Sequence, residues 1–162
     1  MPTSALTPVQ QDYLELMLRL SGEGDAGVRV TDIASEMGIK PPTVVRTVAR
    51  LRAAGFAVQE ERGLVHLTDA GRRVAEQLRH RHRDIVVLLV DVLGLERSRA
   101  ERDACVIEHG LADETAERLH EFLLRWFELP DETRALLASP VSKLDSPHFN
   151  LLETKSNRGA RY

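Results

Sequence analysis

The sequence predicts a mainly α-helical protein, with an N-terminal winged helix-turn-helix followed by a helical domain. Apolar residues recur at helical spacing along most of its 162 residues. Gly38 and the pair Pro41–Pro42 indicate a tight turn between two helical segments, because glycine ends helices and proline opens them. Residues 56–59 and 64–68 alternate apolar and polar side chains, which predicts two short strands. Residues 60–63 would join them as a small β-hairpin wing.

Three helices are expected before the hairpin, at about residues 8–21, 32–37 and 41–54. The hydroxyl of Thr31 is expected to cap the second helix, and Gly55 is expected to end the third. The apolar side chains that should pack this unit together are Val30, Ile33, Ala34, Met37, Ile39, Val44, Val48 and Leu51.

The second half of the chain is expected to be helical almost throughout. A long helix should run from Thr68 to about Leu93, where Gly94 ends it. Further helices are expected at about residues 98–109, 113–127 and 130–138. The last residues are polar and carry Pro, Gly and Asn, which predicts a loosely ordered tail. We therefore divide the chain into residues 1–75, the winged helix-turn-helix, residues 76–139, the helical domain, and residues 140–162, the C-terminal tail.

Charge is distributed unevenly along the chain, although the net charge is only −3. Residues 28–75 hold eight Lys and Arg against five Asp and Glu, whereas residues 96–134 hold six against eleven. A basic module suits the phosphate backbone of nucleic acid, and an acidic one suits cations. Aromatic residues make up 4% of the chain, too few for a platform that stacks single-stranded nucleic acid. Double-stranded DNA is therefore the expected partner.

The third helix is expected to enter the major groove of DNA with its N-terminal end first. Thr43 can contact a thymine methyl group or a phosphate, and Arg46 can pair with guanine or a phosphate. Basic residues farther along the helix and in the wing are expected to contact phosphates, which position the protein without specifying sequence. The expected DNA-contacting set is Lys40, Pro42, Thr43, Arg46, Thr47, Arg50 and Arg62. A solvated basic face in a protein–protein module is the alternative interpretation.

Residue types that bind metals occur on three of the expected helices, which lie far apart in the sequence. Asp12 and Glu15 lie three residues apart and so share one face of the first helix. A later helix carries Cys105, Glu108 and His109 on one face, and the long helix carries His80 and His82. Each residue alone fits an ordinary solvated or core position. Together, carboxylate, imidazole and thiolate make up a transition-metal ligand set.

Short segments spread over about three quarters of the chain match a known family. They are Gln11-Asp12-Tyr13-Leu14-Glu15, Pro42-Thr43-Val44, Thr47-Val48-Ala49-Arg50, Leu64, Leu67-Thr68, Gly71, Arg81-His82, Ala104-Cys105 and Glu108-His109. In these segments the chain resembles the iron- and manganese-dependent repressors, the diphtheria toxin repressor family with its manganese-transport-regulator branch. The resemblance implies that the helical domain binds metal and dimerises, and that the homodimer binds operator DNA.

The resemblance also implies which residues bind the metal: Asp12, Glu15, His82, Cys105, Glu108 and His109. The manganese branch has acids at positions 12 and 15 but usually a carboxylate where Cys105 stands. The iron branch has cysteine there but methionine where Asp12 stands. Glu101 and Val86 stand where the second metal site of the iron branch has a histidine and an acid. An iron-type second site is therefore not expected.

These observations predict a manganese-responsive repressor that binds palindromic operator DNA and controls metal-homeostasis genes. Carboxylate oxygens suit Mn(II), whereas a thiolate suits Fe(II), which is the alternative metal. A winged-helix regulator that senses a small molecule or an oxidant through Cys105 is a second alternative. An enzyme is not expected, because no catalytic motif is present.

A cytoplasmic location is expected, with no membrane and no small-molecule substrate as partner. The chain holds a single cysteine, which suits a reducing compartment. Residues 1–7 lack the basic and apolar regions of a signal peptide. No apolar run approaches the roughly 20 residues of a membrane span.

Overall fold

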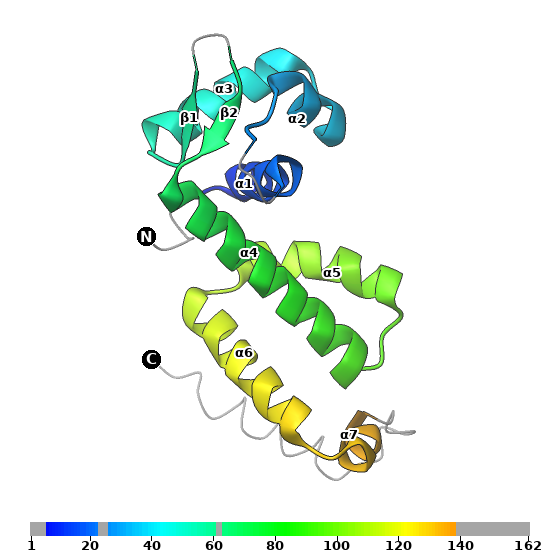
Figure 1. The fold of residues 1–162 in the computed structure, drawn as a ribbon. Coiled ribbons are helices and arrows are strands. Elements are labelled where there is room, and N and C mark those ends of the chain that lie inside the picture. The colour runs from blue at the N-terminus through cyan, green and yellow to red at the C-terminus, as the bar shows by residue number, and fades with distance from the viewer. Residues whose placement is uncertain (1–5, 23–25, 61–62, 139–162) are drawn as a thin grey trace, which may run out of the picture.

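The computed structural model describes residues 6–22, 26–60 and 63–138 and confirms the mainly helical fold class. Its N-terminal elements are α1 (Pro8–Ser21), α2 (Val30–Met37), α3 (Pro41–Ala53), β1 (Ala57–Gln59) and β2 (Val65–Leu67). Its C-terminal elements are α4 (Asp69–Val87), the π-helical segment η2 (Leu88–Val92), α5 (Arg97–Gly110), α6 (Asp113–Glu128) and α7 (Asp131–Ala138). Figure 1 shows the two groups at opposite ends of the molecule, with α4 extending between them.

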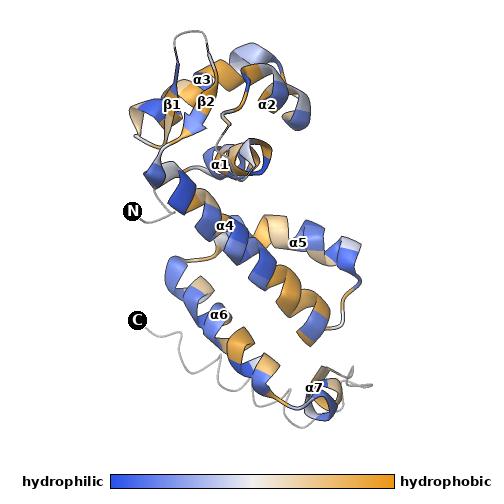
Figure 2. Cartoon of the chain, viewed as in Figure 1, coloured by the Kyte–Doolittle hydropathy of each residue, from blue (hydrophilic) through white to orange (hydrophobic). Residues whose placement is uncertain are grey.

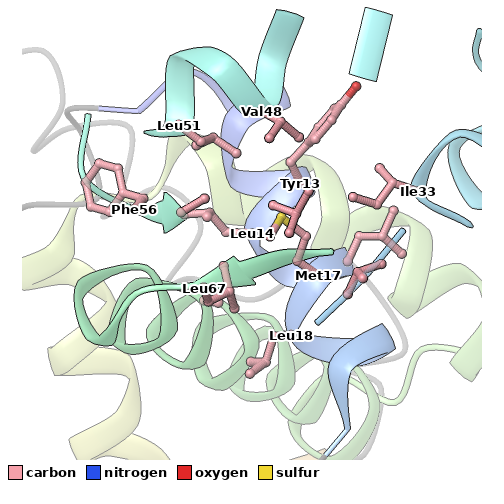
Figure 3. Packing of buried hydrophobic residues seen from close by; sticks show 14 of the residues in the cluster. Tyr13, Leu14, Met17, Leu18, Ile33, Val48, Leu51, Phe56 and Leu67 are labelled. Atoms are coloured by element: carbon pink, nitrogen blue, oxygen red, sulfur yellow. The ribbon is translucent and has the colours of Figure 1, made fainter. Parts of the chain in front are cut away.

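The N-terminal group is the expected winged helix-turn-helix. Strands β1 and β2 pair antiparallel, with Val58 opposite His66, and Val28 adds a bridge to Val65. Gly38 ends α2 in the left-handed conformation, at φ 65°, which glycine adopts without steric cost. Figure 3 shows how buried side chains from α1, α2, α3 and the hairpin interdigitate in one core: Tyr13, Leu14, Met17, Leu18, Ile33, Val48, Leu51, Phe56 and Leu67.

Helix α2 begins earlier than the sequence indicated. Thr31 was expected to cap it, but α2 starts at Val30, and Arg29 occupies the capping position without a side-chain hydrogen bond. The backbone carbonyl of Arg29 accepts from the N–H groups of Asp32 and Ile33. Val30 is partly buried against the core, so the helix begins two residues before the expected start at Asp32, and Thr31 lies inside the first turn. The expectation for Thr31 was therefore wrong.

Thr68 joins the wing to α4. Its hydroxyl accepts a hydrogen bond from the Gly71 N–H and donates one to the Gly55 carbonyl. A Cβ on Gly71 would lie only 1.9 Å from the Phe56 carbonyl oxygen. A glycine is thus required where α4 crosses the start of the hairpin.

A second core lies between α4, η2 and α5. It contains Ile85, Val86, Leu89, Ala100 and Ala104, and in Figure 2 the C-terminal part of α4 is correspondingly hydrophobic. The small side chains of Ala100 and Ala104 allow α5 to lie close to α4. The long helix ends where expected, but its last turn is π-helical, a local widening that the sequence did not indicate. Among the described helices, none is long and apolar enough to span a bilayer.

Candidate metal centre and DNA interface

The expected metal ligands come together where α1, α4 and α5 meet. Helix α1 supplies Asp12 and Glu15, α4 supplies His82, and α5 supplies Cys105 and Glu108, and all five line one pocket. These side chains reach one point because α1 packs across α4, and α4 packs along α5. Side chains from three helices that are far apart in the sequence therefore share one site.

Three ligand atoms at the centre of this cluster lie close enough together to bind one ion. A ring nitrogen of His82, the Sγ of Cys105 and a carboxylate oxygen of Glu108 all lie within 4.8 Å of one another. Donors bound to one ion at about 2.0–2.3 Å lie up to about twice that distance apart. The donor atoms and their spacing thus fit a divalent transition metal.

His109 connects this cluster to α1. Its Nε2 lies 3.0 Å from the Asp12 Oδ1 and 3.8 Å from the Glu108 Oε1. Its Nδ1 lies 2.8 Å from the side-chain oxygen of Gln11, a residue whose type and spacing in the sequence did not indicate a place in the site. His109 therefore joins the winged unit to the helical domain through two side chains of α1.

His82 is held between two carboxylates. Its Nδ1 lies 2.9 Å from Glu108 and its Nε2 lies 3.0 Å from Glu101. Glu101 is thus a neighbour of the cluster, although in the sequence it stands out only as a departure from the iron branch. His80 lies on another face of α4, in a cavity shared with α6, and does not join the cluster.

The carboxylates in the cluster lie close together and are partly buried, and the positively charged groups around them do not fully offset their negative charge. Burial, together with the nearby carboxylates of Glu108 and Asp12, raises the pKa of Glu15 to about 7. Burial also raises the pKa of Glu108, and burial followed by the neighbouring carboxylates raises the pKa of the Cys105 thiol. Burial alone would lower the pKa of His82, but its hydrogen bond to Glu101 and the charge of Glu108 raise it. Such a site favours a bound cation.

A buried arginine secures the helix end that carries Glu108 and His109. The guanidinium of Arg81 donates to the backbone carbonyls of Glu108 and Leu111 at 3.2 and 2.9 Å. It also donates to the Asp113 Oδ1 at 2.5 Å. Arg81 therefore ties α4 to the end of α5 and to the start of α6. In the sequence, Arg81 stands out only as the residue before His82 in the segment that matches the family.

Helix α3 presents a polar, basic face to solvent. Lys40, Pro42, Thr43, Arg46 and Arg50 are all exposed, and no ion pair between these basic residues and another described residue is found. Thr47 is half-buried, and its hydroxyl donates to the Thr43 carbonyl within the helix. Arg62 lies outside the described residues.

An apolar side chain of α3 is also exposed to solvent, which the sequence pattern did not indicate. Val45 is 53% exposed, between Thr43 and Arg46. An exposed valine here has no role in the core, and an apolar side chain can contact a thymine methyl group in the major groove.

Comparison with known proteins places the chain in a family. Residues 5–65 match the N-terminal DNA-binding domain of iron-dependent repressors, and residues 68–132 match their metal-binding and dimerisation domain. An uncharacterized HTH-type transcriptional regulator of Methanocaldococcus jannaschii is 33% identical over 113 residues, which cover 70% of this chain and 90% of that protein. The diphtheria toxin repressor of Corynebacterium diphtheriae is 31% identical over 140 residues, which cover 86% of this chain and 59% of that repressor.

Solved structures agree with this assignment. A manganese-dependent transcriptional repressor in complex with manganese has a TM-score of 0.63 and 29% identity, covering 70% of this chain and 52% of that one. The regulator ScaR with bound Zn²⁺ has a TM-score of 0.63 and 31% identity, covering 70% and 53%. The chain thus spans about half the length of these structures. The relatives are transcriptional regulators, in agreement with the expectation of a regulator and not an enzyme. The chain belongs to the iron-dependent repressor family, the metal-dependent transcriptional repressors that include the diphtheria toxin repressor.

Proposed function

We propose that this protein is a manganese-responsive repressor that binds palindromic operator DNA as a metal-activated homodimer and controls metal-homeostasis genes in the cytoplasm. The observation that carries the proposal is that carboxylates of α1, in the winged unit, meet the donors of α4 and α5. Residues 1–75 are the proposed DNA-binding domain and residues 76–139 the proposed dimerisation and metal-binding domain. The tail, residues 140–162, lies outside the described residues.

The proposed ligands are Asp12, Glu15, His82, Cys105, Glu108 and His109. In the absence of a cation, the carboxylates of Asp12, Glu15 and Glu108 repel one another, which opposes close docking of α1 against α5. A bound divalent cation supplies the positive charge that offsets this repulsion. The ligands on α1 then fix the winged unit, and with it α3, relative to the helical domain. In a dimer this sets the spacing of the two α3 helices near one DNA turn, about 34 Å.

Manganese is the proposed metal because three of the six donors are carboxylates, the ligand type that suits Mn(II). A specific observation favours Fe(II) as the second candidate: the Sγ of Cys105 lies inside the cluster with His82 and Glu108. The raised pKa of Cys105 does not support an oxidant sensor, because redox-sensing cysteines have lowered pKa values.

The proposed DNA-reading surface is the exposed face of α3, with Thr43 and Arg46 at the base edges. Lys40, Pro42 and Arg50 are exposed beside them and are assigned to the phosphate backbone, as is Arg62. Thr47 is assigned to the same surface, although its hydroxyl is used within the helix.

The proposed homodimer would cover apolar side chains that the single chain leaves exposed. Val106 is 77% exposed and Ile107 lies beside it on α5, within the stretch that matches the dimerisation domain. We expect the double variant Val106→Glu, Ile107→Glu to shift the protein towards monomer in sedimentation velocity. Val58→Glu, an equivalent change at an exposed valine of the wing, should leave the dimer intact. A double variant that remains as dimeric as the parent would remove α5 from the proposed interface.

The central test is operator binding as a function of metal. Palindromic DNA selected from a random library would be titrated with metal-free protein, and again with Mn(II), Fe(II) under anaerobic conditions, and Zn(II), with fluorescence anisotropy as the readout. We expect tight binding only with metal, reversed by chelator, and the strongest response to Mn(II) at physiological concentrations. Glu108→Gln should abolish the response, whereas Glu121→Gln, an exposed change on α6, should not. Equal DNA affinity with and without metal would contradict the proposal.

A further inference from the structure

Gln11 is buried between the metal cluster and the start of α1, and no ligand role accounts for it. Its side chain is 3% exposed. Its Nε2 donates to the Leu6 carbonyl oxygen at 3.3 Å, and its Oε1 lies 2.8 Å from the Nδ1 of His109. Because the Gln11 amide has one donor end and one acceptor end, its orientation determines which hydrogen bond it makes with the Leu6 carbonyl and which with the His109 ring.

The direction of these two hydrogen bonds follows from the chemistry of the groups. A backbone carbonyl only accepts hydrogen bonds, so the amide nitrogen of Gln11 must face Leu6. The amide oxygen must then face His109, and an amide oxygen also only accepts. The Nδ1 of His109 must therefore carry the proton of this hydrogen bond.

The other ring nitrogen of His109 faces the metal cluster. Nε2 lies 3.0 Å from Asp12 and 3.8 Å from Glu108. A histidine binds a metal through a nitrogen that carries no proton, and a hydrogen bond at the opposite nitrogen decides which one that is. The Asp12 carboxylate can also accept a proton from Nε2, so without a metal the ring lies between two acceptors. A cation in the cluster would occupy the Asp12 carboxylate, and Gln11 is then the acceptor that holds the remaining proton on Nδ1 and leaves Nε2 available to the metal.

We propose that Gln11 is a positioning residue that keeps the proton of His109 on Nδ1 and so presents Nε2 to the metal. This inference rests on the proposed metal-dependent function and adds a residue outside the ligand set. Because Gln11 lies on α1, it can hold His109 in this state only while α1 is docked. It therefore couples the orientation of a ligand on α5 to the position of the winged unit.

The first test needs no metal. Protein with ¹⁵N-labelled histidine would be studied by NMR at about pH 9, well above the usual histidine pKa, with His109→Gln to identify the signals of His109. Because Asp12 competes for the proton at Nε2, we expect the parent and Gln11→Glu, whose carboxylate still accepts from Nδ1, to hold a substantial share of His109 in the Nδ1–H form. We expect Gln11→Leu, which has no acceptor, to shift His109 towards the Nε2–H form. An unchanged proton position in Gln11→Leu would overturn the proposal.

The second test measures Mn(II) affinity in the same variants. Loss of a hydrogen-bond partner behind a ligand weakens metal binding about 10–100-fold, and we expect this loss in Gln11→Leu. Gln11→Glu should bind within a few-fold of the parent, and Gln77→Leu, the same change at an exposed position on α4, should match the parent.

Thermal melts separate this role from a purely structural one. Both Gln11 variants lose the bond to the Leu6 carbonyl, so both should be destabilised, but only Gln11→Leu should lose metal affinity. Equal weakening of Mn(II) binding in Gln11→Leu and Gln11→Glu would show that Gln11 acts only through folding and would overturn the proposal. If the parent binds no metal, the proposed function fails, while the NMR test still decides whether Gln11 sets the proton position.

Discussion

Replacing Asp113 with asparagine tests how far the buried guanidinium of Arg81 depends on the negative charge of the Asp113 carboxylate. Arg81 has a side chain only 6% exposed, and its NH2 lies 2.5 Å from the Asp113 Oδ1. Asp113→Asn removes the negative charge but keeps the size of the side chain. The guanidinium keeps its two carbonyl acceptors, on Glu108 and Leu111.

The expected loss in the free energy of unfolding for Asp113→Asn lies between the values known for breaking buried and exposed ion pairs. Breaking a fully buried pair costs about 3–5 kcal/mol, because a charge is left uncompensated. The Asp113 side chain is 41% exposed, so water screens the pair and can partly solvate Arg81 once the charge is lost. The hydrogen bonds from Arg81 to the carbonyls of Glu108 and Leu111 remain, which reduces the loss of stability further. We expect a loss of about 2 kcal/mol in the free energy of unfolding, which lowers the Tm of a domain of this size by about 4–8 °C.

Asp131→Asn provides a matched control. Asp131 also lies in the first turn of a helix and also pairs with an arginine, Arg134, but its side chain is 91% exposed. Helix-dipole effects are therefore similar in the two variants, whereas burial of the arginine is not. Thermal unfolding followed by circular dichroism should give a decrease of no more than about 2 °C for Asp131→Asn. Equal decreases for the two variants would refute the argument that burial of Arg81 sets the cost.

Three further outcomes are expected. Gly71→Ala should destabilise the protein by more than about 2 kcal/mol in urea unfolding, because its Cβ would collide with the Phe56 carbonyl; a stable variant would mean that α4 can shift. Arg46→Ala and Thr43→Ala should each weaken operator binding by about 1–3 kcal/mol while metal binding and dimerisation are retained; unchanged affinity in both would refute the orientation of α3. Asp12→Met should weaken the Mn(II) response of DNA binding relative to Fe(II), and a parental Mn(II) response would show that Asp12 does not set selectivity.

Local interactions explain why most of the fold could be predicted from the sequence. Apolar spacing identified the helices, and the hydroxyls of Thr7 and Thr68 cap α1 and α4 within three residues of their own positions. The hairpin followed from alternation and a short turn. The start of α2 was misplaced because burial of Val30, a tertiary contact, outweighed the capping preference of Thr31.

The sequence by itself determined the element types and, through spacing and family resemblance, the candidate ligands, because these depend on residues three or four positions apart. Only the tertiary structure decided that α1 reaches α5, that His82 lies between Glu108 and Glu101, and that Gln11 and Arg81 stand behind the cluster. These contacts depend on how helices cross, and the crossing is set by the packing of side chains such as Ala100 and Ala104 between whole elements. No periodicity within a single helix carries that information.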